Sequence, residues 1–159
     1  MSSPQILNVV KATREHAEFV AANLYPEEVR EIEAYGFTAA DGVMFSFHKA
    51  KHCWVADSPD GVVCMWGVSS DGTLIGGTAA WMVTTTLLDK YARSVLRQIK
   101  PRLYELCEQC NGLEAFVDSR HERALRFFEW LGFDISNGIP VGKQGIPFHK
   151  ITLRPDNVY

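Results

Sequence analysis

The chain has 159 residues, of which 47% are hydrophobic and 22% are charged, so it has enough apolar side chains for the core of one domain spanning residues 1–159. Its formal net charge of -3 argues against nucleic-acid binding, which needs a dense lysine and arginine surface. The sequence shows no apolar run long enough for a signal peptide or a membrane span. We therefore expect a cytoplasmic protein with neither a membrane nor a nucleic-acid partner.

The first fifty residues predict one strand followed by short helices. Residues 6–10 form a β-branched run typical of a strand, and Thr13 can cap a helix whose apolar residues recur at helical spacing. A second helix is expected between Pro26, which suits a first turn, and Gly36, which suits a C-terminal stop. Thr38, with an acidic residue three positions later, resembles a capping box and predicts a further short helix.

The middle of the chain predicts a meander of three strands. Residues 52–56 and 62–68 are apolar runs joined by SPDG, which has the composition of a hairpin turn. The segment SSDGTLIGG, residues 69–77, predicts a second turn. Residues 78–85 are almost all small, apolar or β-branched, so we expect a central strand that is buried on both faces.

A long amphipathic helix is expected next, over residues 87–110. Its apolar residues keep helical spacing, and Pro101 should kink or divide it. A short strand is predicted at residues 113–117 and another helix at residues 122–131, which a glycine follows.

Two final strands, near Phe133 and at residues 149–153, complete an order of elements that predicts an α/β (α+β) fold. The sheet should be mixed and mostly antiparallel. The long helix returns the chain to the same sheet, so the fourth and fifth strands are expected to be parallel neighbours carrying Trp81 and Phe116. The same helix should cross one face of the sheet.

The segment ALRFFEWLGFDI, residues 124–135, carries a motif at the end of the last predicted helix. The Gcn5-related N-acetyltransferase (GNAT) family commonly has Asn, Ala, Tyr, Glu, Leu, Gly and Phe at the positions of His121, Ala124, Phe128, Glu129, Leu131, Gly132 and Phe133. Five of the seven match, and over most of its length the chain resembles that family. The resemblance implies splayed parallel fourth and fifth strands, helices on both faces, and acetyl or other acyl transfer from acyl-coenzyme A to a small-molecule or protein amine.

The resemblance also implies a coenzyme site between the fourth strand and the long helix. Family members carry a glycine-rich loop there, whereas this chain has TTTLLDKYAR, in which side chains restrict the approach of phosphate and Asp89 would repel it unless turned away. Main-chain groups of the strand would hold the pantetheine arm, and the helix N-terminus with nearby cations would hold the phosphates. The implied cofactor-binding residues are Met82, Val83, Thr84, Lys90 and Arg93.

The expected catalytic residues depart from the family pattern at the general acid, and several residues are candidates for the general base. Phe128 stands where many members have a tyrosine that protonates the departing thiolate, and phenylalanine has no proton to give. We still expect its ring to face the groove between the fourth and fifth strands. A base that deprotonates the amine, directly or through water, can be chosen among Glu33, Glu114, Asp118 and His121.

A narrower resemblance links the chain to GNAT-like internal virion proteins and acetyltransferase-like proteins of short-tailed bacteriophages. It rests on the glycine-free segment, the strand CWVAD and the helix HERALRFFEWLGF. It implies a phage-encoded protein located in the host cytoplasm or the virion. Such a protein could be an acyltransferase of weak or unusual activity, or an inactive GNAT-fold protein that binds a host or virion protein.

The cysteines and histidines predict no metal centre. Cys107 and Cys110 form a CxxC, but Cys53 and Cys64 lie on two arms of a predicted hairpin and do not form a second pair of zinc ligands. Without an export signal the four should be free thiols. The spacing of His48, His52, His121 and His149 matches no metal-binding motif.

The last helix should have an apolar inner face and one exposed aromatic residue. Ala124, Phe127, Phe128 and Leu131 fall on one side at helical spacing and are expected to face inward. Trp130 lies off that side, so we expect it to be exposed and to mark a contact surface.

Overall fold

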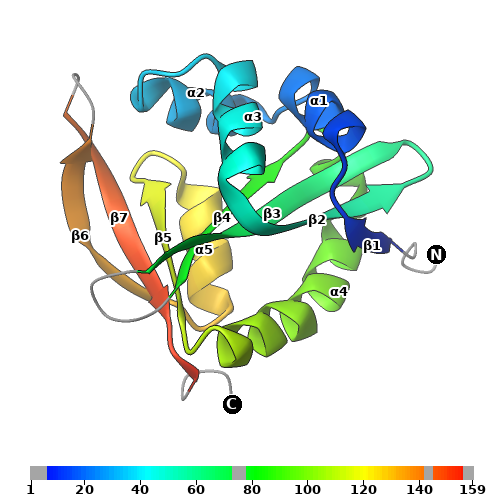
Figure 1. Ribbon diagram of the computed structural model, residues 1–159. Helices are drawn as coiled ribbons and strands as arrows, with labels where there is room; N and C mark the ends of the chain where they lie inside the picture. The colour runs from blue at the N-terminus through cyan, green and yellow to red at the C-terminus, as the bar shows by residue number, and fades with distance from the viewer. Residues whose placement is uncertain (1–6, 73–77, 142–144, 156–159) are drawn as a thin grey trace.

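The computed structural model describes residues 7–72, 78–141 and 145–155 and contains a sheet flanked by helices (Figure 1). The strands are β1 (Asn8–Lys11), β2 (Ala50–Ser58), β3 (Gly61–Gly72), β4 (Thr78–Thr84), β5 (Leu113–Asp118), β6 (Asp134–Val141) and β7 (Ile146–Leu153). The helices are α1 (Arg14–Ala22), α2 (Pro26–Ala34), α3 (Ala39–Lys49), α4 (Leu88–Gln109) and α5 (Glu122–Trp130). None of these helices is long and apolar enough to cross a membrane.

The seven strands form one sheet in the order β1-β2-β3-β4-β5-β7-β6. All neighbouring pairs are antiparallel except β4 and β5, which are parallel. The predicted mixed sheet is therefore confirmed, and Trp81 and Phe116 lie on neighbouring strands as expected. The helix α4 connects these two strands, because parallel strands need a long crossover between them.

Local side-chain contacts explain where the first three helices begin. The hydroxyl of Thr13 accepts a hydrogen bond from the His16 amide, and the His16 ring accepts one from the Thr13 amide. Pro26 occupies the first turn of α2, where its missing N–H costs nothing. Thr38 caps α3 by accepting from the Asp41 amide.

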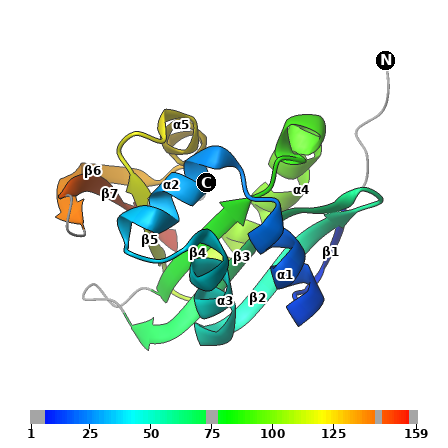
Figure 2. The same cartoon turned by 90° about the horizontal axis from the view of Figure 1, so that it is seen from above.

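Helices cover both faces of the sheet (Figure 2). One core cluster joins Val20 of α1 and Val43 of α3 to Val55 and Met65 of the sheet. On the other face, α4 packs Tyr91, Val95 and Ile99 against β2 and β3, and its C-terminal half packs with α5 against β5 and β7. These two layers place α2 and α5 on opposite sides of the region where β4 leaves β5.

Pro101, which is expected to kink or divide the long helix, does not divide it, because α4 runs unbroken through this residue. A proline removes one hydrogen bond, whereas both halves of α4 bury apolar residues against the sheet. The turn expected at residues 69–77 does not begin at residue 69, since β3 continues to Gly72. The remainder of that expected turn, residues 73–77, lies outside the described part of the chain.

The strand β4 is central, but the prediction that both of its faces are buried is wrong. It pairs with β5 only at Thr78 with Leu113 and at Ala79 with Glu114. Beyond that point the two strands diverge, and residues 79–84 are only half-buried. Small and apolar residues therefore line an opening here rather than a closed core.

Candidate functional site

A cavity of about 480 Å³ lies where β4 and β5 separate. Its walls come from β4 and β5, from the inner face of α2 and from α3, and from α4 and α5. Its volume is within the usual range for small-molecule sites. The splaying of two parallel strands is thus what creates the space.

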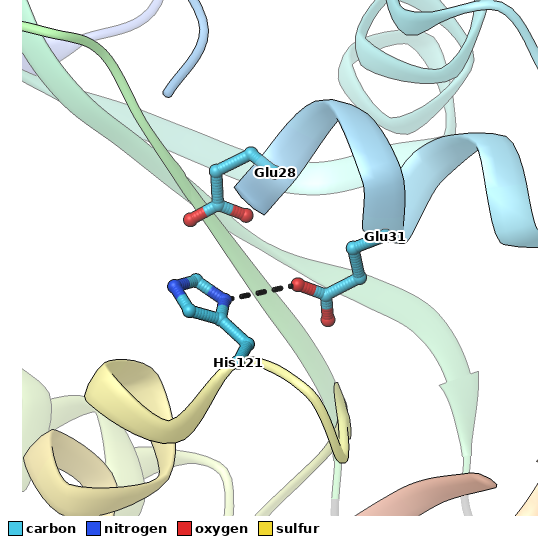
Figure 3. A group of neighbouring side chains, drawn as sticks. All are labelled: Glu28, Glu31 and His121. Carbon is cyan, nitrogen blue, oxygen red and sulfur yellow. Dashed lines mark hydrogen bonds and ion pairs between the residues drawn. The ribbon is translucent and has the colours of Figure 1, made fainter. Parts of the chain in front are cut away.

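Two carboxyl groups and one imidazole meet in the wall of this cavity. Glu28 and Glu31 extend from α2 toward His121, the residue before α5 (Figure 3). The Nδ1 atom of His121 lies 3.4 Å from Oε2 of Glu31. Both Glu28 and His121 are buried, at 6% and 8% exposure. The pair Glu31–His121 is the arrangement in which a carboxylate orients an imidazole.

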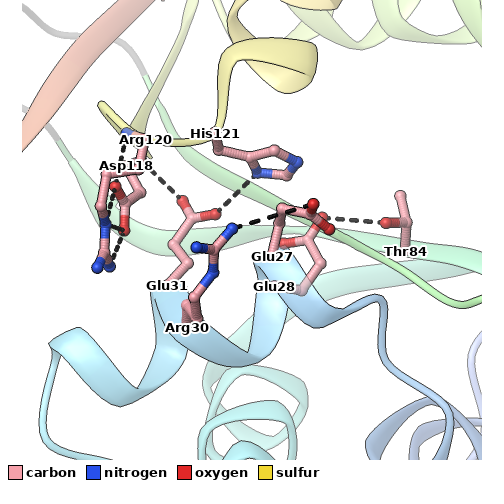
Figure 4. Close-up of polar contacts among 8 residues, drawn as sticks. All are labelled: Glu27, Glu28, Arg30, Glu31, Thr84, Asp118, Arg120 and His121. Atoms are coloured by element: carbon pink, nitrogen blue, oxygen red, sulfur yellow. Dashed lines mark hydrogen bonds and ion pairs between the residues drawn. The ribbon is translucent and has the colours of Figure 1, made fainter.

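The groups around this cluster hold it in place (Figure 4). The hydroxyl of Thr84 donates to Oε1 of Glu28 at 3.1 Å, and the main-chain N–H of Asp118 donates to Oε1 of Glu31 at 3.2 Å. The Asp118 side chain in turn binds the Arg120 guanidinium at 2.6 Å. The cluster therefore joins α2, the end of β4 and the turn after β5.

Burial and mutual charge shift the protonation of these groups. Burial, reinforced by the charge of Glu31, raises the pKa of Glu28 to about 8, so Glu28 is largely protonated at neutral pH. Burial alone would lower the pKa of His121, but the hydrogen bond to Glu31 and the nearby carboxylates outweigh it and raise the pKa. The imidazole of His121 thus faces the carboxyl group of Glu31.

The same three residues form a set that could hold a metal ion. Glu28, Glu31 and His121 each offer one ligand atom, and these atoms lie within 4.8 Å of one another. Imidazole and carboxylate ligands suit zinc and other first-row divalent ions. The sequence pointed to no such set, and the expected absence of a metal stays a prediction.

The four residues proposed as bases lie in different environments. His121 lines the cavity, whereas Glu33 is exposed on α2 outside the described lining. Glu114 is buried on β5 and binds Lys150 at 2.9 Å. Burial alone would raise the pKa of Asp118, but the contacts with Arg120 lower it, and Asp118 serves by holding Glu31. The structure therefore brings His121 to the cavity without the other three.

The five residues assigned to cofactor binding are also divided. Met82, Val83 and Thr84 line the cavity from β4. Lys90 lies in the first turn of α4 and binds Asp60 at 2.7 Å, and Arg93 is exposed further along that helix. The two basic residues are therefore not part of the described lining.

The free edge of β4 is partly covered by the connection between α1 and α2. The amide of Tyr25 donates to the carbonyl of Thr84, and the amide of Thr86 donates to the carbonyl of Asn23. By strand alternation these groups face the side from which β5 has diverged, as do the main-chain groups of Met82. Only the carboxyl end of the edge is occupied in this way.

Charged side chains close the space between α4 and α5 above this edge. Arg123 of α5 donates to Asp89 of α4 at 3.2 Å and to the Tyr25 hydroxyl at 2.8 Å. The Tyr25 hydroxyl also bonds to Asp89. Asp89 is thus neutralised by Arg123 at the N-terminus of α4.

The position of α5 agrees with the expected inner and outer faces. Ala124, Phe127 and Phe128 line the cavity, and Leu131 is fully buried next to the helix. The Phe128 ring contacts those of Phe127 and Phe133 edge-on, at centroid distances of 5.3 and 5.2 Å. Trp130 is 54% exposed, with the Lys100 ammonium 4.0 Å from its ring centre.

The four cysteines lie in separate environments. Cys53 and Cys64 belong to different core clusters, and burial raises the pKa of both thiols to about 12. Cys107 is buried between α4 and β7 and donates to the Leu153 carbonyl. All four are free thiols, with Cys110 the least buried.

Sequence reasoning missed Glu28 and Glu31 as site residues. Glu28 suits the N-terminus of a helix, and that role explains an acidic residue there without any site. The available signal was helical spacing, because both glutamates share the α2 face that carries Ile32 and Tyr35. Acidic residues on the inner face of a helix are costly to bury and therefore indicate a site that needs them.

No protein-family model and no curated protein matches the sequence. Solved structures do match. An N-acetyltransferase from Staphylococcus aureus Mu50 is 13% identical with a TM-score of 0.72, covering 95% of this chain and 99% of its own. Spermidine N-acetyltransferase from Vibrio cholerae, solved with coenzyme A and spermine, is 10% identical with a TM-score of 0.67, covering 96% and 97%.

A third similar structure is yncA from Salmonella typhimurium, solved with acetyl-coenzyme A. It is 11% identical with a TM-score of 0.65, and the match covers 96% of this chain and 95% of that one. At these identities the likeness concerns the backbone. The chain therefore has the GNAT fold, with the parallel β4 and β5 pair and helices on both faces.

Proposed function

We propose that this protein transfers an acyl group from acyl-coenzyme A to a primary amine in the cavity between β4 and β5. One observation carries the proposal: Glu31 and the buried His121 form a pair that lines the cavity between the splayed strands. The GNAT fold supports it, since related folds were solved with coenzyme A or acetyl-coenzyme A. His121 as a possible base and the gap between β4 and β5, which could take an extended ligand, therefore lie together.

The residues present fit the pantetheine arm of a coenzyme better than its pyrophosphate. Main-chain groups of Met82 face the gap beside β4 and can bond to an extended amide chain. At the carboxyl end of β4, the chain's own residues 23–25 use the polar groups of Thr84 and Thr86. With Asp89 also present at the helix N-terminus, phosphate gains little there. We therefore expect weak coenzyme binding, held chiefly by the arm.

In the proposed reaction, His121 acts as the general base. The carboxylate of Glu31 holds Nδ1, which leaves Nε2 to take the proton of the amine. A bound acyl-coenzyme A would supply the acyl carbon as a thioester. The amine nitrogen forms a bond to this carbon as the carbon–sulfur bond breaks, and the proton goes to His121. Because Phe128 has no hydroxyl, solvent protonates the departing thiolate.

A second function, binding without catalysis, is supported by a different observation. The contacts of residues 23–25 with β4 and the Arg123–Asp89 pair both occupy the coenzyme side of the cavity. A protein that does not bind coenzyme can keep these contacts without losing function. The narrower likeness to phage virion proteins belongs to this second proposal, in which a phage-encoded protein binds a host or virion protein.

Release of free thiol from acetyl-coenzyme A, measured with a panel of primary amines, tests the first proposal. EDTA should be present, because Glu28, Glu31 and His121 could hold a metal ion. His121→Gln should lower kcat/KM by about a hundredfold or more, the usual contribution of a general base. Glu31→Gln should lower kcat/KM less, since the imidazole ring remains. The matched control is His48→Gln, at an exposed position on α3.

The outcomes separate the two functions. Turnover that is unchanged in His121→Gln contradicts the role of His121. No thiol release with any amine, together with no change of Tm on adding coenzyme A, contradicts acyl transfer and supports the binding function. A ligand at a hundred times its Kd should stabilise the protein by about 2.7 kcal/mol, which a melting curve resolves.

A further inference from the structure

Aromatic side chains gather, half-exposed, around the cavity. Seven large hydrophobic residues are exposed in the described part of the chain, and five of them line this one space, namely Leu96 and four aromatic residues. The aromatic residues are Tyr35 (46% exposed), Phe37 (40%), Phe45 (50%) and Phe116 (45%). The rings of Phe37 and Phe45 stack at a centroid distance of 5.4 Å. Exposed apolar surface that gathers at one place marks a binding site.

The acidic side chains that line the cavity lie together, and its basic side chains already have partners. Glu28 and Glu31 are its carboxyl groups, and they lie beside each other on α2. The lining contains two basic residues: Arg123, which is bonded to Asp89 and Tyr25, and His121, which is bonded to Glu31. An incoming cation would therefore find charge complementarity at one end of the space only.

We infer that the amine acceptor is a hydrophobic monoamine, with its ammonium group beside Glu28 and Glu31 and an aromatic or long alkyl body against the ring of Phe45 and its neighbours. This inference rests on the proposed function for the reaction, but the binding site itself does not depend on catalysis. Aromatic rings suit such a body because they pair with apolar groups and with nearby cations. Glu28 is also the glutamate bonded to Thr84 of β4, which places the ammonium end next to the splayed strands.

Polyamines fit this cavity less well. Beyond the two glutamates, the lining is largely apolar and includes Ile32, Val43, Phe116 and Phe127. A second ammonium group on the same ligand would have to lie among these side chains without a partner, and an unpaired buried charge is costly. The inference therefore separates this chain from the spermidine N-acetyltransferases that share its fold.

Equilibrium binding without coenzyme tests the inference, using calorimetry and the change of Tm with EDTA present. The probes are 2-phenylethylamine, n-hexylamine, ethanolamine and spermidine. We expect 2-phenylethylamine and n-hexylamine to bind at least tenfold tighter than ethanolamine and spermidine. Spermidine binding as tightly as 2-phenylethylamine, or no binding by any of the four, would overturn the inference.

Paired variants keep the result tied to the site. Phe45→Ser should weaken 2-phenylethylamine about three- to tenfold, the usual worth of an aromatic contact. Its control is Trp130→Ser, an equally exposed aromatic residue that lies outside the cavity lining. Glu31→Gln should weaken both hydrophobic amines, whereas Glu33→Gln on the exposed side of α2 should not. Equal effects within either pair would place the amine elsewhere and overturn the inference.

Failure of the proposed function would look different. Tight binding of 2-phenylethylamine without release of thiol from acetyl-coenzyme A would leave the amine site standing and remove acyl transfer. Thiol release that is fastest with spermidine would keep the transfer and remove the hydrophobic monoamine. The two measurements therefore fail separately.

Discussion

The carboxyl group of Glu28 is the most strongly perturbed group of the candidate site. It is buried beside a second carboxylate and accepts a hydrogen bond from Thr84. An uncharged carboxyl group can remain there because its protonated form avoids the cost of burying a second negative charge. When a cation enters the cavity, the same group can ionise and become its partner.

The pH dependence of stability should report this group. Between its ordinary value of 4.5 and its folded value of about 8, Glu28 keeps a proton that the unfolded chain has released. Its contribution to the free energy of unfolding is therefore full below pH 4.5 and is lost as the pH rises toward 8. The slope is at most about 1.4 kcal/mol per pH unit.

Glu28→Gln should remove this slope, because glutamine has no proton to lose. Urea unfolding of both proteins at several pH values between 5 and 8, in EDTA, measures the difference. Glu33→Gln, at an exposed position on the same helix, controls for the loss of charge. Parallel curves for wild type and Glu28→Gln would show that the pKa of Glu28 is not raised.

Phe128 gives a second prediction at the scale of one residue. Its ring lines the cavity at the position where the resemblance places a tyrosine. If coenzyme binds, Phe128→Tyr should raise kcat more than it changes coenzyme affinity, because a hydroxyl there would act on the leaving thiolate in the transition state. Thiol release by both proteins, with coenzyme saturating, measures this. Equal kcat values would mean that Phe128 does not face the sulfur.

At the scale of elements, the connection between α1 and α2 determines what can reach β4. Its residues 23–25 bond to the free edge of the strand as a third neighbour would, with Leu24 and Thr85 forming an antiparallel bridge. The bridge lies at the carboxyl end of β4 and leaves the middle of the strand open to the cavity. Residues 23–25 therefore close the carboxyl end of the β4 edge to a ligand and leave its middle accessible.

A substitution of Asp89 tests whether coenzyme phosphates bind at the N-terminus of α4. Asp89→Asn removes a negative charge from the N-terminus of α4 and releases Arg123 from its ion pair. Coenzyme A should then bind about fivefold tighter, since one unit charge at 4 Å in water is worth about 1 kcal/mol. Calorimetry at low salt measures this, with Asp41→Asn in the first turn of α3 as the control. Unchanged affinity would place the phosphates away from α4.

At the scale of the whole molecule, the sheet is continuously paired and packed on one side of the cavity, and its pairing is interrupted at the cavity itself. The antiparallel strands β1 to β4 are packed between α1 and α3 on one face and α4 on the other. Among the described residues, no main-chain ladder joins the two halves of the sheet beyond the two paired positions of β4 and β5. The cavity is thus a consequence of the topology and not of a loop.

The packed half should govern global stability. Met65 lies at the centre of β3, is fully buried, and contacts the cluster formed with α1 and α3. Met65→Ala should lower the free energy of unfolding by about 2–5 kcal/mol through lost burial and a residual cavity. Val10→Ala, at a 41% exposed position on edge strand β1, should change it by less than about 0.5 kcal/mol. Urea unfolding distinguishes the two, and equal losses would contradict the place of Met65 in the centre of this core.

Much of the fold was predictable because local patterns dominate it. The caps at Thr13 and Thr38, the proline at the start of α2 and the apolar spacing of α4 each act over a few residues. The parallel pair followed from the length of the crossover helix alone. Pro101 misled because a local rule for helix breaking was outweighed by the burial of both halves of α4.

The sequence by itself determined the elements, their order and the place of His121 before the last helix, since periodicity and capping depend on neighbours along the chain. Only the tertiary structure decided that α2 turns Glu28 and Glu31 toward that histidine, 90 positions along the chain from Glu31. It also decided that residues 23–25 cover the end of β4. Both contacts join residues that lie far apart in the chain, at the place where β4 and β5 part, and no local pattern encodes such contacts.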